Sequence, residues 1–334
     1  MEIFVAGATG AIGQRLVPRL VAAGHHVVAT TRSPAKAALL RALGADPAIM
    51  DGLDPVAVGE AVGRAQPEVV IHQMTQITLS SDLRHFDREF AVTNRLRTEG
   101  TDNLLAAATA AGARRFIAQS YAGWPAIRTG GPVKTEDDPF DPDPPAAQRA
   151  SLAAIRHLEN AVTGAPAVEG IVLRYGSFYG PGTGNEFFAL ARKRKVPLIG
   201  GGAGVWSFLH IDDAAGATVA ALDRGRRGIY NITDDEPAKV ADWLPFVAET
   251  VGGKPPLHVP AWAAKLVAGE VAVSMMTKIR GASNARARAE LGWSPAYPSW
   301  RQGFPAAMAA GAEQAGAAGA GTATAAGKAS DGRH

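Results

Sequence analysis

The glycine-rich segment GATGAIG, residues 7–13, most constrains how this 334-residue chain folds. It directly follows the apolar run IFVA and opens a helical pattern from Ala11 to Ala23. Gly7, Gly10 and Gly13 lie three apart, which suits a tight turn, a close approach of the backbone to a pyrophosphate, and close packing of a helix on a strand. A glycine-rich turn without a ligand is the alternative. We predict a dinucleotide site formed by Gly7, Thr9, Gly10, Ala11, Ile12 and Gly13.

The rest of the chain alternates short β-branched runs with longer helical patterns. The runs after the first are HVVATT, PAIMD, EVVIHQM, RRFIAQS, GIVLRYG and GIYNIT. Strands buried on both faces of a parallel sheet give such unbroken apolar runs, so the pattern predicts an α/β fold with a Rossmann-type doubly wound parallel sheet. The expected helices cover Ala11 to Ala23, Pro34 to Leu43, Pro55 to Ala65, Val92 to Ala111 and Ala146 to Val162.

The same pattern divides the chain into two lobes and a tail. Residues 1–174 form the expected NAD(P)-binding Rossmann domain, and residues 205–235 return to it with GIYNIT. Residues 175–204 and 236–304, rich in glycine and proline turns, form a smaller C-terminal substrate-binding lobe. Residues 305–334 are mostly Ala, Gly and Thr with a few charges and have no apolar period, which predicts a disordered tail.

Composition excludes several classes of protein. The chain has 34 basic and 31 acidic residues, and the net charge of +3 is too small to indicate a nucleic-acid partner. It has no cysteine, which excludes disulfides, thiolate metal sites and a cysteine nucleophile. No basic leader or long apolar segment precedes the first strand, so we expect a cytoplasmic protein without membrane association.

The residues at the ends of the next strands bear on which nicotinamide cofactor is bound. Arg32 ends the second expected strand, where an enzyme built for NAD usually offers an acidic residue. A guanidinium suits a 2′-phosphate, so NADP(H) is preferred and NAD(H) is possible; a solvated surface turn is the alternative. Asp51 meets the adenine end or caps the following helix. Gln73 and Met74, after the fourth strand, complete the expected cofactor site.

Together these motifs resemble the extended short-chain dehydrogenases/reductases, the NAD-dependent epimerase/dehydratase family. The resemblance runs from residue 1 to about Phe304 and rests on GATGAIG, QPEVVIH, GTDNLLAAA, RRFIAQS, LRYGSFYGPG, FLHIDDAAGA, GIYNIT and LGWSPAYPSWRQGF. It implies a cleft with the cofactor on the Rossmann side and a small-molecule substrate on the other. It also implies a homodimer that pairs the two long helices of each subunit. In such members the His and Asp of this FLHID motif brace the lobes and cap a helix, so the resemblance implies that role for His210 and Asp212, and we expect no metal site.

The chain departs from that family at the residues that transfer the proton. Members normally carry a Tyr and a Lys four residues apart on one helix, and the lysine lowers the phenol's pKa from its usual ~10. Aligning Glu159 with the glutamate that follows the pair puts Ser151 at the tyrosine and Ile155 at the lysine. No Tyr-x-x-x-Lys occurs anywhere in the chain. The asparagine usual three residues before the Gly-Thr of the preceding helix is Arg97.

Other residues at the strand ends are therefore the candidates for chemistry. FIAQSYAGW leaves the fifth strand at its carboxyl end, which faces the ligand crevice in such a sheet. The resemblance puts Ser120 at the family's active-site serine, and Tyr121 is the only tyrosine in the first 174 residues. We predict Ser120 and Tyr121 as catalytic residues, although packing is an equal alternative for Tyr121. The expected substrate-binding residues are Trp124, Tyr175, Ser177, Tyr179 and Trp206, with packing as the alternative for the two later tyrosines.

The residues just before the FLHID motif bear on the class of substrate. Nucleotide-sugar members usually have an arginine there, whereas this chain has GVWS with Trp206. Without that clamp for a diphosphate, we expect a small hydrophobic, even aromatic, substrate. The leading hypothesis is an NADP(H)-dependent oxidoreductase that reduces a carbonyl, an imine or an activated double bond. The alternatives are an epimerase or dehydratase that retains its cofactor, and a non-catalytic NADP(H)-sensing protein.

Overall fold

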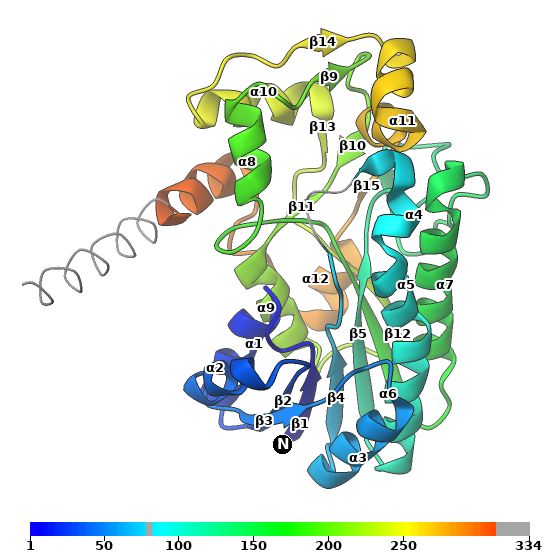
Figure 1. The fold of residues 1–334 in the computed structure, drawn as a ribbon, viewed down its shortest axis with the longest axis vertical. Helices are drawn as coiled ribbons and strands as arrows, with labels where there is room; N and C mark the ends of the chain where they lie inside the picture. Colours follow the sequence, from blue (N-terminus) through cyan, green and yellow to red (C-terminus); the bar gives the residue numbers. More distant parts are fainter. Residues whose placement is uncertain (78–81, 312–334) are drawn as a thin grey trace, which may run out of the picture.

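A seven-stranded sheet forms the centre of the computed structural model, which describes residues 1–77 and 82–311 (Figure 1). All neighbouring strands are parallel, in the order β12-β7-β5-β4-β1-β2-β3, which confirms the predicted Rossmann-type α/β fold. The order reverses between β1 and β4, so the ligand crevice of such a sheet lies at the carboxyl ends of these two strands. The strands are β1 (Glu2–Ala6), β2 (His26–Thr31), β3 (Asp46–Ile49), β4 (Val69–His72), β5 (Arg115–Tyr121), β7 (Glu169–Tyr175) and β12 (Gly228–Ile232).

Helices cover both faces of the sheet, each over its own apolar core (Figure 1). No helix of the described residues is both long and apolar enough to cross a membrane. One face carries α1 (Gly13–Ala22), η1 (Pro34–Lys36), α2 (Ala37–Ala42) and α9 (Ile211–Ala220); the other carries α3 (Pro55–Ala65), α5 (Ala91–Arg97), α6 (Glu99–Ala110), η3 (Ala146–Gln148) and α7 (Arg149–Gly164).

The helix predicted from Val92 to Ala111 is two helices, so that prediction is wrong. Thr98 separates α5 from α6 with φ −96° and ψ −86°, outside the helical region. Its hydroxyl donates a hydrogen bond to the carbonyl oxygen of Asn94 at 3.1 Å, a bond that bends helices. Arg97 is therefore the last residue of α5 rather than a residue inside a continuous helix. The homodimer expected through these helices stays a prediction.

The second lobe lies beyond the carboxyl ends of the strands, at the top of Figure 1. Its core is aromatic and centres on Phe208, Trp243 and Trp300. Short two-stranded sheets pair β10 with β13, β11 with β8, β14 with β9 and β15 with β6. The elements outside the central sheet are η2 (Leu83–His85), α4 (Phe86–Glu89), β6 (Val133–Lys134), β8 (Ser177–Tyr179), α8 (Asn185–Arg192), β9 (Leu198–Ile199), β10 (Val205–Trp206), β11 (Phe208–His210), β13 (Ala238–Lys239), α10 (Val240–Thr250), β14 (His258–Val259), α11 (Ala261–Thr277), β15 (Gly281–Ala282) and α12 (Ala285–Leu291).

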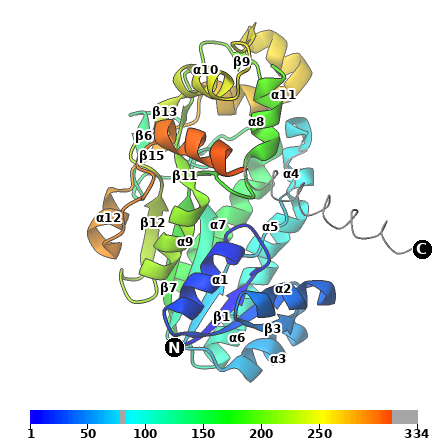
Figure 2. The ribbon, with the colours of Figure 1, turned by 90° about the vertical axis from the view of Figure 1, so that its left-hand side faces the viewer.

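The C-terminal boundary of the folded part lies later than predicted. Residues 300–311 are helical, and this helix is the orange one in Figure 2. Trp300, Phe304 and Ala307 lie on one face of it and are buried in the core of the second lobe. A disordered tail from residue 305 is therefore wrong for residues 305–311, because a spacing of four and three residues gives this segment an apolar face. Residues 312–334 lie outside the described residues.

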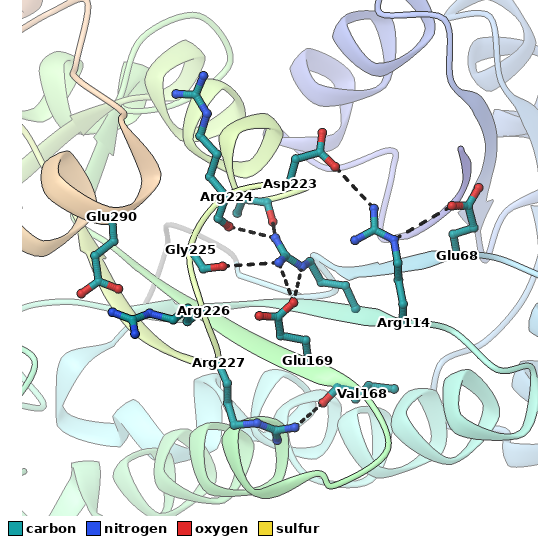
Figure 3. Close-up of polar contacts among 12 residues, drawn as sticks. Glu68, Arg114, Val168, Glu169, Asp223, Arg224, Gly225, Arg226, Arg227 and Glu290 are labelled. Atoms are coloured by element: carbon teal, nitrogen blue, oxygen red, sulfur yellow. Dashed lines mark hydrogen bonds and ion pairs between the residues drawn. The ribbon is translucent and has the colours of Figure 1, made fainter.

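A cluster of arginines fixes the returning segment to the sheet at the edge away from the crevice (Figure 3). Nη1 of Arg115, on β5, donates to the carbonyl oxygens of Ala221 and Arg224 beyond α9 at 2.7 and 2.8 Å. Its Nη2 pairs with Glu169 of β7 at 2.6 Å. Such charge-assisted bonds to free carbonyls at a helix end are strong. Helix α9 and strand β12 thus belong to the Rossmann domain, whereas β10, at the start of the predicted returning segment, pairs with β13.

Candidate active site

The glycine loop has the shape that a dinucleotide requires. Gly7 has φ +87°, and a Cβ there would lie 2.6 Å from the carbonyl oxygen of Gln73, so only glycine fits. A Cβ on Gly13 would lie 2.3 Å from the carbonyl oxygen of Ala8, so α1 packs closely on the turn. Within the described residues no side chain caps α1, and its first turn holds no acidic residue. The N–H groups of Gln14 and Arg15 already donate to the carbonyl oxygens of Gly10 and Ile12, whereas those of Ala11, Ile12 and Gly13 donate to no described residue and are available to an anion.

The residues predicted for the adenosine end lie at the carboxyl ends of β2 and β3. Arg32 is exposed, and its Nη2 donates to Oε1 of Gln76 at 3.1 Å. Asp51 accepts a hydrogen bond from the backbone N–H of Leu53 at 3.0 Å. The cap of α3 is Asp54 instead, which excludes the alternative that Asp51 caps that helix.

Gln73 and Met74 line the base of the glycine loop. The backbone N–H of Gln73 donates to Ala6 at 2.8 Å, and its side-chain Nε2 donates to the hydroxyl of Tyr175 at 3.2 Å. Its Oε1 is buried without a hydrogen-bond partner among the described residues. Met74 packs so closely on Gly52 that a Cβ there would lie 2.4 Å from the sulfur. Gln73 therefore offers a free acceptor, while Met74 fills space beneath the cofactor side.

The two positions that correspond to the family's Tyr and Lys are committed to other tasks. Ser151 is buried; its hydroxyl donates to Oδ1 of Asp87 at 2.6 Å and accepts from Nδ2 of Asn94 at 2.9 Å. Asp87 also accepts from the N–H groups at the start of α7, so this network caps that helix. Ile155 is fully buried in an apolar cluster with Trp124. Neither position supplies an acid or a cation.

Ser120 is tied into a buried ion pair. Its hydroxyl donates to Oε1 of Glu159 at 2.7 Å. The same carboxylate accepts a bidentate pair of bonds from Arg174, at 2.8 Å to Oε1 and 2.6 Å to Oε2. In this arrangement the hydroxyl proton of Ser120 is donated to Glu159, and a catalytic role for Ser120 stays a prediction.

Tyr121 and Ser177, predicted for different roles, lie side by side. The Tyr121 hydroxyl and Ser177 Oγ are 2.9 Å apart. Burial raises the pKa of Tyr121, while Ser177 and the nearby Arg97 guanidinium oppose that rise. The phenol is therefore neutral near pH 7 and is a hydrogen-bond donor. Burial also lowers the pKa of Arg97, to about 10, so this side chain stays cationic.

The structure places the two other tyrosines in the interior. Burial raises the pKa of Tyr175 to about 12, and its hydroxyl lies 2.7 Å from Oγ1 of Thr218. Tyr179 packs edge-on against Phe304, with 5.0 Å between the ring centroids. Both side chains are almost fully buried, so they present no atom to a cleft. Against the expectation of substrate contacts, we assign both to packing.

The remaining substrate and metal expectations concern Trp124, Trp206 and His210. Trp124 is buried against Phe86. Trp206 is partly exposed, and its Nε1 donates to the carbonyl oxygen of Met275 at 2.9 Å. Nδ1 of His210 accepts from the N–H of Asp212, so His210 caps α9, which begins at Ile211. Among the described residues, no group of three or more His, Asp and Glu side chains is arranged to hold a metal.

The sequence analysis did not predict that three charged residues of the site lie together: Arg97, Glu159 and Arg174. Arg174 stands inside the apolar run IVLRY, and a charge within a buried strand is a sign of a buried partner. Glu159 served only as an alignment mark, and Arg97 only as a departure from the family. Their contacts depend on the packing of α5, α7, β5 and β7, which sequence spacing does not reveal.

The sheet, the glycine loop at its switch point and the lobe beyond the strand ends define a two-lobed dinucleotide-binding protein. Residues 3–233 match the model of the NAD dependent epimerase/dehydratase family, and the chain belongs to that family. It is 47% identical over 310 residues to a 3-diazoavenalumate denitrifying reductase of Streptomyces sp, with 91% of this chain and 99% of that protein covered. That relative's name indicates an oxidoreductase.

Solved structures of the family share the fold. A UDP-glucose 4-epimerase of Thermotoga maritima, solved with UDP-glucose, superimposes with a TM-score of 0.75 at 22% identity, over 94% of this chain and 99% of that one. A human epimerase family protein solved with NADPH superimposes with a TM-score of 0.69 at 20% identity, over 92% and 98%. At such identities the likeness is one of fold.

Proposed function

We propose that the protein is an NADP(H)-dependent reductase that replaces the diazo group of a small hydrophobic, aromatic compound by hydrogen and releases dinitrogen. The name of the relative that is 47% identical over nearly its whole length supports the diazo class. The apolar and aromatic residues around Trp206 support a hydrophobic substrate.

The residues of the crevice fit a nicotinamide dinucleotide. The N–H groups at the start of α1 suit the pyrophosphate, and the exposed Arg32 suits a 2′-phosphate. The free acceptor Oε1 of Gln73 lies at the base of the glycine loop. When bound, NADPH supplies a hydride.

The observation that carries the proposal is the commitment of Ser151 and Ile155 to capping and packing. Reduction of a carbonyl needs a proton on the oxygen, which the family's Tyr and Lys deliver. An aryl diazonium carbon needs none, because a hydride forms the C–H bond while the C–N bond breaks and its electron pair leaves with dinitrogen. A site without the usual acid is sufficient for that reaction.

Tyr121 supports a second substrate class, the carbonyl, imine or activated double bond of a small hydrophobic compound. Its neutral phenol is hydrogen-bonded to Ser177 and is able to give a proton to a substrate oxygen. The two classes differ in whether a proton is consumed together with the hydride.

A labelled turnover experiment tests the proposal. The protein is mixed with NADPH deuterated at C4 of the nicotinamide and with a ¹⁵N-labelled diazo derivative of 4-hydroxycinnamate. We expect loss of the nicotinamide absorbance, one labelled dinitrogen per NADPH, and deuterium at the former diazo carbon. NADPH oxidation only with ketones, imines or enones would favour the second class. Product without net NADPH consumption would indicate an epimerase or dehydratase, and tight NADPH binding without any turnover would indicate a sensor.

A further inference from the structure

Within residues 1–77 and 82–311, Arg97 is a buried cation without a direct partner. Its side chain is at the end of α5, and the residue is only 8% exposed. No hydrogen bond or ion pair to a described residue contributes to its pKa; burial lowers it, and only the charges of Glu159 and Tyr121 act in the other direction. None of its nitrogens is among the fully sealed polar atoms without a partner, so the guanidinium reaches accessible space.

Of the carboxylates in the part of the chain that the structure describes, only Glu159 acts on the pKa of Arg97, and it already has other partners. Glu159 gives both oxygens to Arg174 and accepts a further bond from Ser120 on Oε1. Two buried guanidinium groups, of Arg97 and Arg174, thus share one buried carboxylate. Two cations and one carboxylate leave one positive charge without a counter-charge. Such a buried charge is costly unless a further anion binds.

That spare charge lies at the crevice. Nε2 of His72 lies 3.3 Å from the carbonyl oxygen of Leu96, so Arg97, the next residue of α5, lies beside the carboxyl end of β4. Its charge opposes the rise in the pKa of Tyr121, the last residue of β5. It also acts on the pKa of His72, the last residue of β4, which burial lowers to about 4 and so keeps neutral. The carboxyl ends of β4 and β5 border the switch point at which ligands bind in this fold. Arg97 therefore faces the same region as the Tyr121 and Ser177 hydroxyls.

We propose that Arg97 binds an anionic oxygen of the substrate, a carboxylate or a phenolate, next to the Tyr121 hydroxyl. The inference rests on the proposed function only for the identity of the reacting compound. A guanidinium binds such an oxygen through charge-assisted hydrogen bonds, and binding balances the unpaired charge. Loss of one such bond changes affinity by about 10- to 100-fold.

Binding of matched charged and neutral aromatic compounds tests this. Calorimetry measures the binding of cinnamate and of its uncharged amide to the protein loaded with NADP⁺, and of 4-nitrophenol below and above its ionisation. The wild-type protein is expected to bind at least one anion about 10- to 100-fold more tightly than its neutral partner. Arg97→Met is expected to abolish that preference, and Arg97→Lys to keep part of it.

Two controls separate binding from structure. Arg95→Met removes a guanidinium two residues away on α5, where it is exposed and paired with Glu99, and should leave the preference unchanged. NADPH affinity should be equal in wild type and Arg97→Met; a parallel loss would mean that the cofactor is the anion, which overturns the inference.

The remaining outcomes distinguish the role of Arg97 from the proposed reaction. No preference for either anion in the wild type, or an unchanged preference in Arg97→Met, would refute the role of Arg97 even if the diazo compound is reduced. A preference that depends on Arg97, in a protein that reduces no diazo compound, would support this inference and leave the proposed reaction wrong.

Discussion

Glu159→Gln is expected to lower the free energy of unfolding strongly, because it breaks a buried ion pair. An exposed ion pair of the same geometry serves as the comparison. The pair of Glu159 with Arg174 and the pair of Glu99 with Arg95 have nearly the same bidentate geometry, with bonds of 2.8 and 2.6 Å in the first and 2.8 and 2.7 Å in the second. The first pair is 2% and 10% exposed, whereas the second is 49% and 57% exposed. Breaking a buried pair leaves an uncompensated charge and costs about 3–5 kcal/mol.

The cost at Glu159 lies at the upper end of that range, because the substitution leaves the charges of both Arg174 and Arg97 without a carboxylate. Glu99→Gln is the control and should leave stability essentially unchanged, since water solvates its exposed partner Arg95. Urea unfolding at pH 7, followed by tryptophan fluorescence, gives the free energy of unfolding of each variant. Equal shifts in the two variants, or a Glu159→Gln protein as stable as wild type, would refute the reasoning.

Three further predictions concern the cofactor and the second lobe. Gly7→Ala should abolish NADPH binding, because the Cβ meets the Gln73 carbonyl and φ is +87°, whereas Gly63→Ala in α3, with open space around it, should bind normally; calorimetry measures both. Arg32→Ala should weaken NADPH about tenfold or more and leave NADH unchanged, and equal losses for the two would contradict a 2′-phosphate contact. Burial raises the pKa of Asp234 to about 8, so the folded chain holds a proton that the unfolded chain releases above ~4, and stability should fall as the pH rises from about 4 to about 8. Asp234→Asn should flatten that fall in urea midpoints between pH 5 and pH 8.5, and an unchanged slope would exclude Asp234 as its source.

Local rules made the Rossmann half predictable. Gly13 fits its role because the turn and the start of α1 follow each other within a few residues, so the spacing places it against Ala8, whereas Gly7 approaches Gln73 at the end of β4. The strands were predictable because a strand buried on both faces of a sheet needs apolar residues at successive positions, which gives a visible apolar run. The division between α5 and α6 was not predictable in this way. The hydroxyl of Thr98 bonds to the carbonyl oxygen of Asn94 where the predicted helix divides, and nothing in the helical pattern indicates this.

Non-local packing decided what the sequence did not reveal. Tyr175 leaves β7 toward the crevice, yet Thr218 of α9 closes over its hydroxyl. Tyr179 is covered by Phe304, from a helix that the alanine-rich composition concealed. The signal for that helix was present in the spacing of Trp300, Phe304 and Ala307. Burial at such sites depends on which distant segment packs there, and a single sequence does not carry that information.

The apolar residue Ile155 and the buried cation Arg97 are related: we infer that Arg97 takes the place of the lysine that the family has at position 155. In the family that the chain resembles, the cation of the site comes from α7, four residues after the tyrosine. Here α7 offers Ile155 at that place, sealed against Trp124, and the cation comes from Arg97 on α5. Glu159, one turn further along α7, is the only carboxylate of the described residues that acts on the pKa of Arg97, and it is already bound to Arg174.

A second cation at position 155 would therefore have no counter-charge. Ile155→Lys alone should cost several kcal/mol of stability, because it buries an unpaired ammonium near an unpaired guanidinium. Adding Arg97→Asn, the family's usual residue, should recover part of that loss, since one positive charge then remains where two stood. A double-mutant cycle on the urea midpoints measures the coupling. Strictly additive effects would mean that the two positions are electrostatically independent and that Arg97 does not take the place of the missing lysine.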